Sequence, residues 1–572
     1  MSDPFCRIQD GIDAASTGDT VLVLPAIYVE NLDFLGKDIS VVGTAGSETT
    51  IVDGNQAGSV VMFRTGEGPG ARLAGFTLMN GSGFDDLVIP ARGGGVFCIG
   101  ASPRIEDCVI VSNGGQSIAY WGGGVYALDS SIALSGCTIE DNSVDLQGGG
   151  IYLENPSAAS IDDCLIRDNS AEGQGGGIAV FGGSVAITST IVSGNRASFD
   201  MGGGISLDGA LATIAECEIA DNDAFDDHSG GGLAVLGGTV TVVHTTLARN
   251  SGAHGGGAFV SSGQADFVAC TFADNLSQSV FGALSGNGGG LFVGPGSAVT
   301  ARGCVFTGNR GLEGDNGIAR GGAVFGPADL FHCTLVGNET TELAGGAWGA
   351  SLCNCIVWDN APGALGGAAT ATASDVQGGW SGFANIDADP GFWFAESGDY
   401  RLTPGSPCIG AGLLDCSGVV LGTDMGALTF DPGYCPAPQS YCTTTVHSEG
   451  CAPPISFTGT PTLSGADDFF ITADEIVAQQ FGILIWSGTP DEAPFMGATL
   501  CLAAPIVRTP VQNSGGMGGA CEGAFAFHFS HAYMGSQMIA VLDAVFVQYW
   551  FRDPGSSPAI GLSDALAFVV CP

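Results

Sequence analysis

The amino-acid sequence predicts an all-β solenoid in which short strands stack coil upon coil. Between residues 93 and 360 a glycine block recurs at intervals of 24 to 33 residues. Each block opens a unit that closes on an apolar residue followed, three positions later, by asparagine. Inward positions lie two residues apart, as in Ile178 and Val180, which is the period of a strand. A fixed period of this length is typical of a solenoid, because each unit can bury its apolar face only against its neighbours.

Ten asparagines close the units and form the first column. They are Asn113, Asn142, Asn169, Asn195, Asn222, Asn250, Asn275, Asn309, Asn338 and Asn360. In register, equivalent side chains of stacked strands lie about 4.8 Å apart. We expect each asparagine to adopt a left-handed backbone conformation and to bond its side-chain amide to the coils above and below. The column is therefore predicted to brace the scaffold.

A second column stands five positions before the asparagines and holds cysteine in eight units. The cysteines are Cys108, Cys137, Cys164, Cys217, Cys270, Cys304, Cys333 and Cys355. Thr190 and Thr245 occupy the other two positions, which a bonded pair would not permit at both sites. Parallel side chains on adjacent strands do not readily reach the dihedral angle of a disulfide. The column is predicted to consist of buried free thiols that act as small apolar fillers, with metal binding as the alternative.

The chain is expected to divide into four parts. Residues 1–35 are predicted to form an N-terminal cap, with a short amphipathic helix, and the first coil. Residues 36–360 are predicted to form the solenoid, and the chain is expected to wind about 13 coils in all. Residues 361–432 are expected to close the solenoid with further coils and a cap. After a joint rich in proline and cysteine, residues 433–572 are predicted to form a small antiparallel β-sandwich.

The repeated residues carry a family resemblance. The glycine-aliphatic start, as in Gly93-Gly94-Gly95-Val96, and the apolar-x-x-Asn end, as in Ile110 and Asn113, resemble the GG(A/V)(I/L) and FxxN repeats of polymorphic outer-membrane proteins. The resemblance covers roughly residues 93–360. It implies a right-handed parallel β-helix, with coils wound as in pectate lyases, and a surface or adhesin-like role. The module after residue 432 resembles C-terminal modules of secreted proteins from planctomycete-like marine bacteria, which implies no activity.

Charge and hydropathy exclude several classes of partner. The chain has 58 acidic and 15 basic residues, a formal net charge of -43, so nucleic acid and anionic lipid are poor partners. No apolar run reaches the length of about 18 residues that a membrane span requires. The N-terminus shows no signal peptide. The cysteines of the C-terminal module nevertheless suit an oxidising compartment, so we expect an extracellular or cell-surface protein.

Six cysteines in the C-terminal module are predicted to form three disulfides. They are Cys435, Cys442, Cys451, Cys501, Cys521 and Cys571. Six cysteines can pair in 15 ways, and the sequence says little about which pairing forms. The preferred pairing joins Cys442 to Cys451, Cys501 to Cys521 and Cys435 to Cys571. The last pair would join the two ends of the module.

Aromatic residues are the candidates for glycan binding. Some lie in the variable loops between the asparagines and the glycine blocks, and others form outward-facing stripes on three successive coils. The loop candidates are Tyr120, Trp121, Phe199 and Phe225, and the stripe candidates are Phe97, Tyr126 and Tyr152. Aromatic faces beside carboxylates suit stacking on sugar rings. The alternative is structural, because aromatic residues also pack loops onto coils and stack across strands.

Two groups of ionisable residues are candidates for chemistry. Glu106, Asp107, Asp162 and Asp163 lie at one bend of nearby coils and could share a calcium ion, although solvated surface is the alternative. Asp226, Asp227 and His228 could supply an acid and a base for glycoside cleavage, but a triplet in one loop is a weak signal. The scarcity of basic residues argues against a lyase that needs a basic residue as general base.

The sequence therefore predicts a non-catalytic β-helix protein for adhesion or glycan binding. A polysaccharide-degrading lyase or glycoside hydrolase is the first alternative. A structural surface-layer or filament component, which would self-associate, is the second. A polysaccharide or a cell-surface glycan is the expected partner, and calcium is the one cofactor considered.

Overall fold

The computed structural model describes most of the chain. The described residues are 5–84, 91–114, 121–225, 228–279, 286–312, 318–414, 416, 422–442, 447–448, 450–496, 498–517, 521–557 and 559–571. The chain separates into two compact units, Met1–Phe430 and Asp431–Pro572. The boundary predicted from the sequence lies two residues later, between residues 432 and 433. None of the helices in the described ranges is long and apolar enough to cross a membrane.

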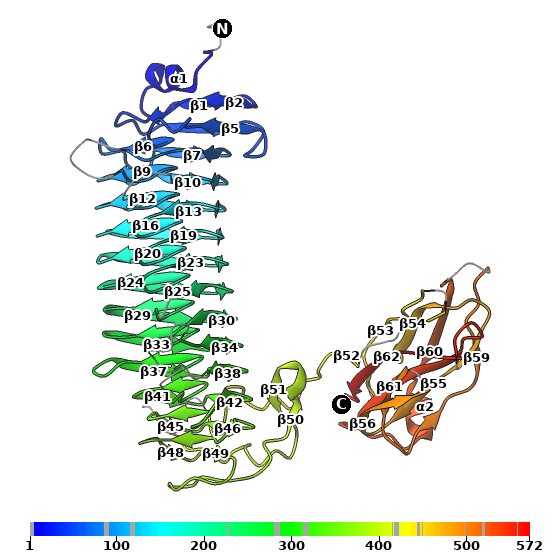
Figure 1. The fold of residues 1–572 in the computed structure, drawn as a ribbon. Coiled ribbons are helices and arrows are strands. Elements are labelled where there is room, and N and C mark those ends of the chain that lie inside the picture. The colour runs from blue at the N-terminus through cyan, green and yellow to red at the C-terminus, as the bar shows by residue number, and fades with distance from the viewer. Residues whose placement is uncertain are drawn as a thin grey trace. The chain divides into compact units, whose positions relative to one another are not determined.

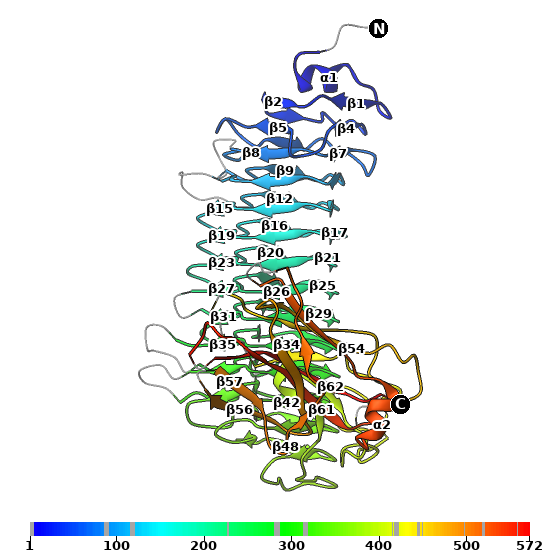
Figure 2. The same ribbon diagram turned by 90° about the vertical axis from the view of Figure 1, so that its right-hand side faces the viewer.

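The first unit is a solenoid of parallel strands, as Figures 1 and 2 show. Two of its sheets, which we name sheet A and sheet B, contain 14 strands each. Sheet A comprises β1 (Thr20–Val23), β4 (Ser40–Gly43), β7 (Arg72–Ala74), β10 (Arg104–Glu106), β13 (Ala133–Ser135), β17 (Ala159–Asp162), β21 (Ser184–Thr188), β25 (Ala210–Ala215), β29 (Gly238–Val243), β33 (Gln264–Val268), β37 (Ala298–Arg302), β41 (Ala328–Phe331), β45 (Ser351–Cys353) and β48 (Thr370–Thr372). Sheet B comprises β2 (Ala26–Val29), β5 (Thr50–Asp53), β8 (Thr77–Met79), β11 (Val109–Val111), β14 (Thr138–Glu140), β18 (Leu165–Arg167), β22 (Ile191–Ser193), β26 (Glu218–Ala220), β30 (Thr246–Ala248), β34 (Thr271–Ala273), β38 (Val305–Thr307), β42 (Thr334–Val336), β46 (Ile356–Trp358) and β49 (Asp375–Val376).

Two further sheets complete the coils. Sheet C comprises β3 (Leu32–Asp33), β6 (Val61–Phe63), β9 (Val96–Ile99), β12 (Val125–Leu128), β16 (Ile151–Glu154), β20 (Ile178–Phe181), β24 (Ile205–Asp208), β28 (Leu233–Val235), β32 (Ala258–Val260), β36 (Leu291–Val293), β40 (Val324–Phe325), β44 (Ala347–Trp348) and β47 (Leu365–Gly366). The short sheet D comprises β15 (Ser143–Val144), β19 (Ser170–Ala171), β23 (Arg196–Ala197), β27 (Asp223–Ala224), β31 (Ser251–Gly252), β35 (Leu276–Ser277), β39 (Arg310–Gly311) and β43 (Glu339–Thr340). The predicted all-β solenoid is confirmed, with 14 strands in each of sheets A and B where about 13 coils are expected.

The asparagine column braces the coils by hydrogen bonds, as predicted. All ten side chains are buried. The side-chain oxygen of Asn222 accepts from the backbone N–H of Asn195 and from its Nδ2, both at 3.0 Å. In turn, Nδ2 of Asn222 donates to the carbonyl oxygen of Val192 at 2.9 Å and to Oδ1 of Asn250 at 3.0 Å. Each link thus satisfies polar groups that the coil interior would otherwise leave unpaired.

The left-handed conformation falls one position earlier than expected. No asparagine of the column has a positive φ, whereas the residue before each of the ten does, from Ser112 at 54° to Asp359 at 50°. This placement turns the chain before the asparagine, so the asparagine itself points into the coil. Aspartate, serine and glycine dominate these positions, and the first two tolerate the left-handed region by bonding their own backbone. The expectation for the asparagine backbone is therefore wrong by one residue.

The cysteine column is buried and carries free thiols, as predicted. All eight cysteines are unbonded. A thiol donates to a backbone carbonyl of its own or a neighbouring coil, as Cys137 does to Ile105 at 3.4 Å. Thr190 fits the same column because its hydroxyl donates to the carbonyl of Thr188 at 2.8 Å. Burial raises the pKa of Cys108 to about 12, so the thiolate form is disfavoured.

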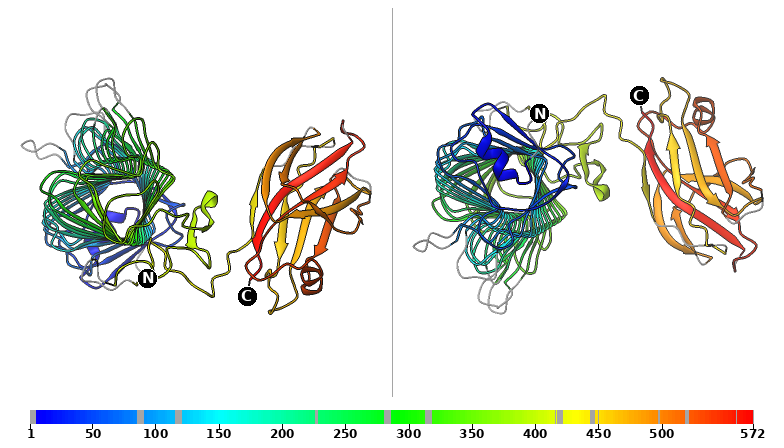
Figure 3. Two further views of the ribbon diagram at one scale, coloured as in Figure 1. Left: turned by 90° about the horizontal axis from the view of Figure 1, so that it is seen from below. Right: turned by 90° about the horizontal axis from the view of Figure 1, so that it is seen from above.

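The two ends of the solenoid are closed by different means. At the first coil, α1 (Ile8–Ala14) lies over the open end, with Ile8 and Ile12 buried in the coil interior; Figure 3 shows this end-on. Beyond the last coil, β50 (Phe392–Phe394), η1 (Ala395–Ser397) and β51 (Asp399–Leu402) form a small hairpin. A disulfide between Cys353 and Cys416 ties this closing segment to β45, a bond that the sequence analysis does not anticipate.

The second unit consists of antiparallel sheets around a separate core. Its larger sheet comprises β52 (Gln439–Tyr441), β62 (Ile560–Val569), β61 (Ala544–Arg552), β55 (Phe481–Ser487), β58 (Val507–Arg508) and β59 (Gln512–Asn513). The smaller elements are β53 (Ile455–Thr458), β54 (Phe470–Ile476), β60 (Gly523–His528), the hairpin β56 (Pro490–Phe495) and β57 (Ala498–Leu502), and α2 (His531–Ser536). Side chains from the larger sheet, such as Tyr549 and Phe568, pack with Ile471 of β54 and others to form the core.

The disulfides of this unit differ in part from the preferred pairing. Cys435 is joined to Cys571, as the sequence analysis expects. The other two bonds join Cys442 to Cys501 and Cys451 to Cys521, so the expected Cys442–Cys451 and Cys501–Cys521 pairs are wrong. The actual bonds connect segments that are distant in sequence and adjacent in the sandwich. Spacing along the chain carries no signal for such pairs.

Candidate functional site

A shallow polar groove on the outer face of sheet A is the candidate functional site. It has a volume of about 500 Å³ and runs across β29, β33, β37 and the start of β41. In each strand the alternate residues face outward, so the groove receives the side chains that the coil interior does not. Its polar lining residues are Thr239, Thr241, Gln264, Asp266, Ser297, Thr300, Arg302 and Asp329.

The strand register aligns these side chains in rows. Thr241, Asp266, Thr300 and Asp329 are consecutive partners on four neighbouring strands. Their side chains therefore follow one another at the strand spacing of about 4.8 Å. Ser351 continues the row on β45. The groove thus offers a hydroxyl or a carboxylate on every coil it crosses.

Arg302 neutralises one carboxylate of the groove. Its Nη1 forms an ion pair with Asp266 and a hydrogen bond of 3.1 Å with the hydroxyl of Thr300. The Thr300 hydroxyl also bonds to Asp266. The guanidinium lies 5.7 Å from the ring centroid of Phe331. These contacts fix Asp266 and Arg302 in place, so the charge that remains on this row is that of Asp329.

None of these groove residues is among the candidates predicted from the sequence. Those candidates lie in loops, at one bend and on the strands of sheet C, whereas the groove lies on the strands of sheet A. A signal is present in the alternation of polar and apolar residues, as in Thr239-Val240-Thr241 and Gln264-Ala265-Asp266. Such alternation is common to every half-buried strand, so on its own it does not distinguish a site from ordinary surface.

The first aromatic stripe is covered. Phe97, Tyr126 and Tyr152 do face outward from sheet C and stack with ring centroids 5.7 and 5.4 Å apart, yet they are only 3%, 0% and 6% exposed. Arg92 donates to the Tyr126 hydroxyl at 2.9 Å, and its guanidinium lies 5.2 Å from the Tyr126 ring centroid. Burial raises the pKa of Tyr126 to about 12. The stripe faces outward as expected, but neighbouring side chains cover the rings, and the structural alternative accounts for this packing.

The loop candidates differ in how far other side chains pack against them. Trp121 packs 6.5 Å from Tyr152 and lies under Arg92, and Phe225 lies 4.0 Å from the guanidinium of Arg196. Phe199 is 58% exposed. Tyr120, Asp226 and Asp227 lie outside the described residues, so the proposed acid-base triplet with His228 stays a prediction.

The four acidic residues at the bend do not converge. Glu106 and Asp162 occupy equivalent positions two coils apart, with Ser135 between them. That separation is roughly 10 Å at the strand spacing, too far for parallel side chains to share one cation. Glu106 pairs with Arg72 at 2.6 Å, while Asp107 and Asp163 take positive φ angles at the turn. A calcium ion shared by these residues stays a prediction that this spacing does not support, and no cluster of three metal-binding side chains occurs in the described part of the chain.

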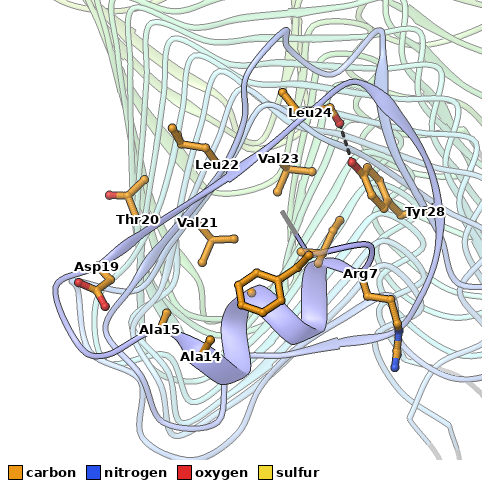
Figure 4. Close-up of a pocket in the computed structure, with 13 residues that line it drawn as sticks. Arg7, Ala14, Ala15, Asp19, Thr20, Val21, Leu22, Val23, Leu24 and Tyr28 are labelled. Atoms are coloured by element: carbon orange, nitrogen blue, oxygen red, sulfur yellow. Dashed lines mark hydrogen bonds between the residues drawn. The ribbon is translucent and has the colours of Figure 1, made fainter. Parts of the chain in front are cut away.

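A second hollow lies at the N-terminal end of the solenoid (Figure 4). It has a volume of about 440 Å³ and lies between α1 and β1. The Tyr28 hydroxyl donates to the carbonyl of Leu24 at 2.8 Å along its rim. Leu22 and Leu24 are 67% and 66% exposed and point away from α1, whereas Val21 and Val23 point towards it (Figure 4). This hollow belongs to one coil and lacks the rows of repeated polar groups that cross the groove on sheet A.

A family model agrees with the observed fold. A family model described as a right handed beta helix region matches residues 71–210 and 149–340. The structure of pectate lyase Pel9A is similar at 13% identity and a TM-score of 0.32, over 74% of this chain and 90% of that chain. The catalytic unit of a GH87 alpha-1,3-glucanase from Streptomyces thermodiastaticus strain HF3-3 is similar at 16% identity and a TM-score of 0.32, over 67% and 65%. No curated protein matches the chain. The matching family model and the parallel strand topology identify the first unit as a right-handed parallel β-helix. The similarities to the two solved structures are too distant to assign an activity.

Proposed function

We propose that the protein is an extracellular or cell-surface glycan-binding protein that holds a neutral polysaccharide in the groove on sheet A without cleaving it. The observation that carries the proposal is the row of polar side chains on consecutive strands. Sugar hydroxyls donate and accept hydrogen bonds, and threonine, glutamine and aspartate side chains supply the complementary groups. A surface with the same kinds of group on every coil suits a ligand that itself repeats.

Charge restricts the class of polysaccharide. The chain carries a formal net charge of -43, and the one arginine of the groove is paired with Asp266. A polyanion would meet repulsion from the molecule as a whole and no free cation in the described groove. A neutral glycan, which needs hydrogen bonds and no counter-charge, fits this surface better.

The disulfides support the proposed location. Four of them join eight of the 19 cysteines. Disulfides persist in oxidising surroundings such as the cell exterior and are rare where thiol reductants are abundant. We therefore place the protein outside the reducing cytoplasm.

Hydrolysis of the same glycan is the second candidate function. Asp266 and Asp329 stand on one row with a single strand between them, which separates their backbones by roughly 10 Å. Two carboxyl groups about 6.5 to 9.5 Å apart are the arrangement that inverting glycosidases use.

One pair of assays separates the two functions. A glycan array of neutral and anionic polysaccharides should give binding to a neutral member only. The bound polysaccharide, incubated with the protein, should then release no reducing sugar. Release that disappears in Asp329→Asn would establish hydrolysis and contradict the non-catalytic proposal. Absence of binding to any glycan on the array would contradict both functions.

A further inference from the structure

The second unit contains an apolar pocket that the proposed glycan site does not explain. It has a volume of about 280 Å³ and lies against the outer face of the larger sheet, between that sheet and the hairpin of β56 and β57. The lining residues are Ile483, Ile485, Phe495, Leu500, Ile506, Arg508 and Trp550. Six of the seven are apolar, so the pocket has few groups with which to bind a sugar.

The hairpin is held in place, so the pocket is built in advance. The side chain of Gln548 accepts from the backbone N–H of Cys501 at 3.1 Å and donates to the carbonyl of Thr499 at 3.1 Å. The Tyr441 hydroxyl donates to the carbonyl of Cys501 at 2.6 Å, and Cys501 is disulfide-bonded to Cys442. These links fix the base of β57 on the sheet. The hairpin therefore cannot collapse freely onto the apolar side chains beneath it.

Two aromatic residues of the pocket are without aromatic partners. Most of the large rings in the core of this unit pack against others, as Phe529 does against Trp486 at 6.2 Å. Trp550 and Phe495, by contrast, make no ring contact with another aromatic residue of the described part. Trp550 stands opposite Ile483 on the neighbouring strand, and its indole forms one wall of the pocket. An aromatic or branched aliphatic group would find an unused face there.

Arg508 supplies a positive charge at the edge of this apolar space. It lies on the short strand β58 and is exposed. No ion pair or ring contact of Arg508 occurs among the described residues, although acidic residues outnumber basic ones by 58 to 15 in the chain. A guanidinium beside an apolar wall is complementary to a carboxylate attached to an apolar body.

We propose that this pocket binds a small apolar carboxylate, with the apolar body against Trp550 and the carboxylate at Arg508. Apolar cavities of about 150 Å³ in proteins hold a benzene molecule, so 280 Å³ accommodates a ring with a short side arm. The site does not depend on the groove on sheet A. It gives the second unit a binding function of its own.

Titration of the full chain with 3-phenylpropionate, followed by calorimetry, tests the proposal. We expect saturable binding that Arg508→Gln weakens by about fivefold, the effect of losing an exposed ion pair of roughly 1 kcal/mol. The neutral analogue 3-phenylpropanamide should bind the unmodified protein about as weakly as 3-phenylpropionate binds Arg508→Gln. The Arg508→Gln change should not weaken binding of this neutral analogue further. Arg552→Gln is the matched control, because Arg552 is an exposed arginine at the end of β61 that does not line the pocket.

Two outcomes would overturn the proposal. One is the absence of saturable binding to the unmodified protein. The other is unchanged binding after Leu500→Trp, which should fill the pocket. Thr241→Arg in the groove on sheet A should leave 3-phenylpropionate binding intact, so failure of the glycan proposal and failure of this one are distinguishable.

Discussion

The β-helix and the C-terminal sandwich are stabilised in opposite ways. The β-helix repeats the same contact along its axis, with an asparagine hydrogen-bonded to the next coil and free cysteines beside it. The sandwich repeats nothing and joins distant segments by three disulfides. Repetition lets each coil stabilise its neighbours, and the Cys353–Cys416 disulfide ties down the closing segment. The sandwich is small, and covalent bonds supplement its core.

Removal of a sandwich disulfide should have one of the two largest effects. Cys451→Ala with Cys521→Ala opens a loop of 70 residues, which we expect to cost about 4 kcal/mol of unfolding free energy. The β-helix has a separate core and should be unaffected. Hydrogen exchange resolved by peptide measures the two units independently. Equal loss of protection in residues 93–360 would contradict the separation of the two units.

A carboxylate in the asparagine column should lower the unfolding free energy of the β-helix. Asn222→Asp keeps the shape but replaces a donor to Val192 and Asn250 by an acceptor, and it buries a charge. We expect a loss of about 3 to 5 kcal/mol at neutral pH in urea unfolding. Burial raises the pKa of the introduced carboxyl above its unfolded value, so the loss should shrink as the pH falls and the group is protonated. Gln278→Glu, the same chemical change on an exposed side chain, should cost less than about 0.5 kcal/mol.

Acid should loosen the closing segment of the β-helix through His332. Its Nδ1 bonds to the carbonyl oxygen of Asp424 at 3.1 Å, and its Nε2 faces Nδ2 of Asn354 at 3.0 Å, so the ring is neutral with the proton on Nδ1. Burial lowers the pKa of His332. The unfolded chain therefore binds a proton below about pH 6.5 before the folded protein does, and stability should fall as the pH drops through that range. Unfolding free energies at pH 7.5 and 5.5 should differ less in His332→Gln than in the unmodified protein, and His528→Gln, at a more exposed site, should keep the full difference.

A conservative change in the cysteine column should have the smallest effect. Thr190 and Thr245 already occupy this column, so Cys217→Thr should change the unfolding free energy by less than about 1 kcal/mol. Thiol titration provides the companion measurement. Cys6, the exposed free cysteine of the native protein, should react quickly, and eleven free thiols should react after denaturation without reductant. A lower count after denaturation would mean that ladder cysteines are bonded.

The same contrast explains what the sequence could predict. The ten asparagines and eight cysteines repeat, so their burial and their bonding follow from local periodicity. The Cys442–Cys501 and Cys451–Cys521 bonds depend on how strands meet in the sandwich, which no local pattern records. The burial of Tyr126 depends likewise on Arg92, which comes from the preceding coil.

The candidate site was missed for a related reason. Asp266, Thr300 and Asp329 are ordinary polar residues of separate strands until the register places them in one row. Arg302 then decides which carboxylate is compensated. Both the row and the Arg302–Asp266 pair join residues that are distant in the sequence. The only local signal is the alternation of polar and apolar residues, which every half-buried strand shows.

A matched pair of variants on one coil tests the central claim most directly. Thr241 lines the groove on β29, and Thr246 is equally half-buried on β30 of sheet B. Affinity for the polysaccharide found on the array should fall at least about tenfold in Thr241→Arg, since the added side chain occupies the groove, a change of about 1.4 kcal/mol. Thr246→Arg should bind as the unmodified protein does. Equal affinity of the two variants would contradict glycan binding on sheet A.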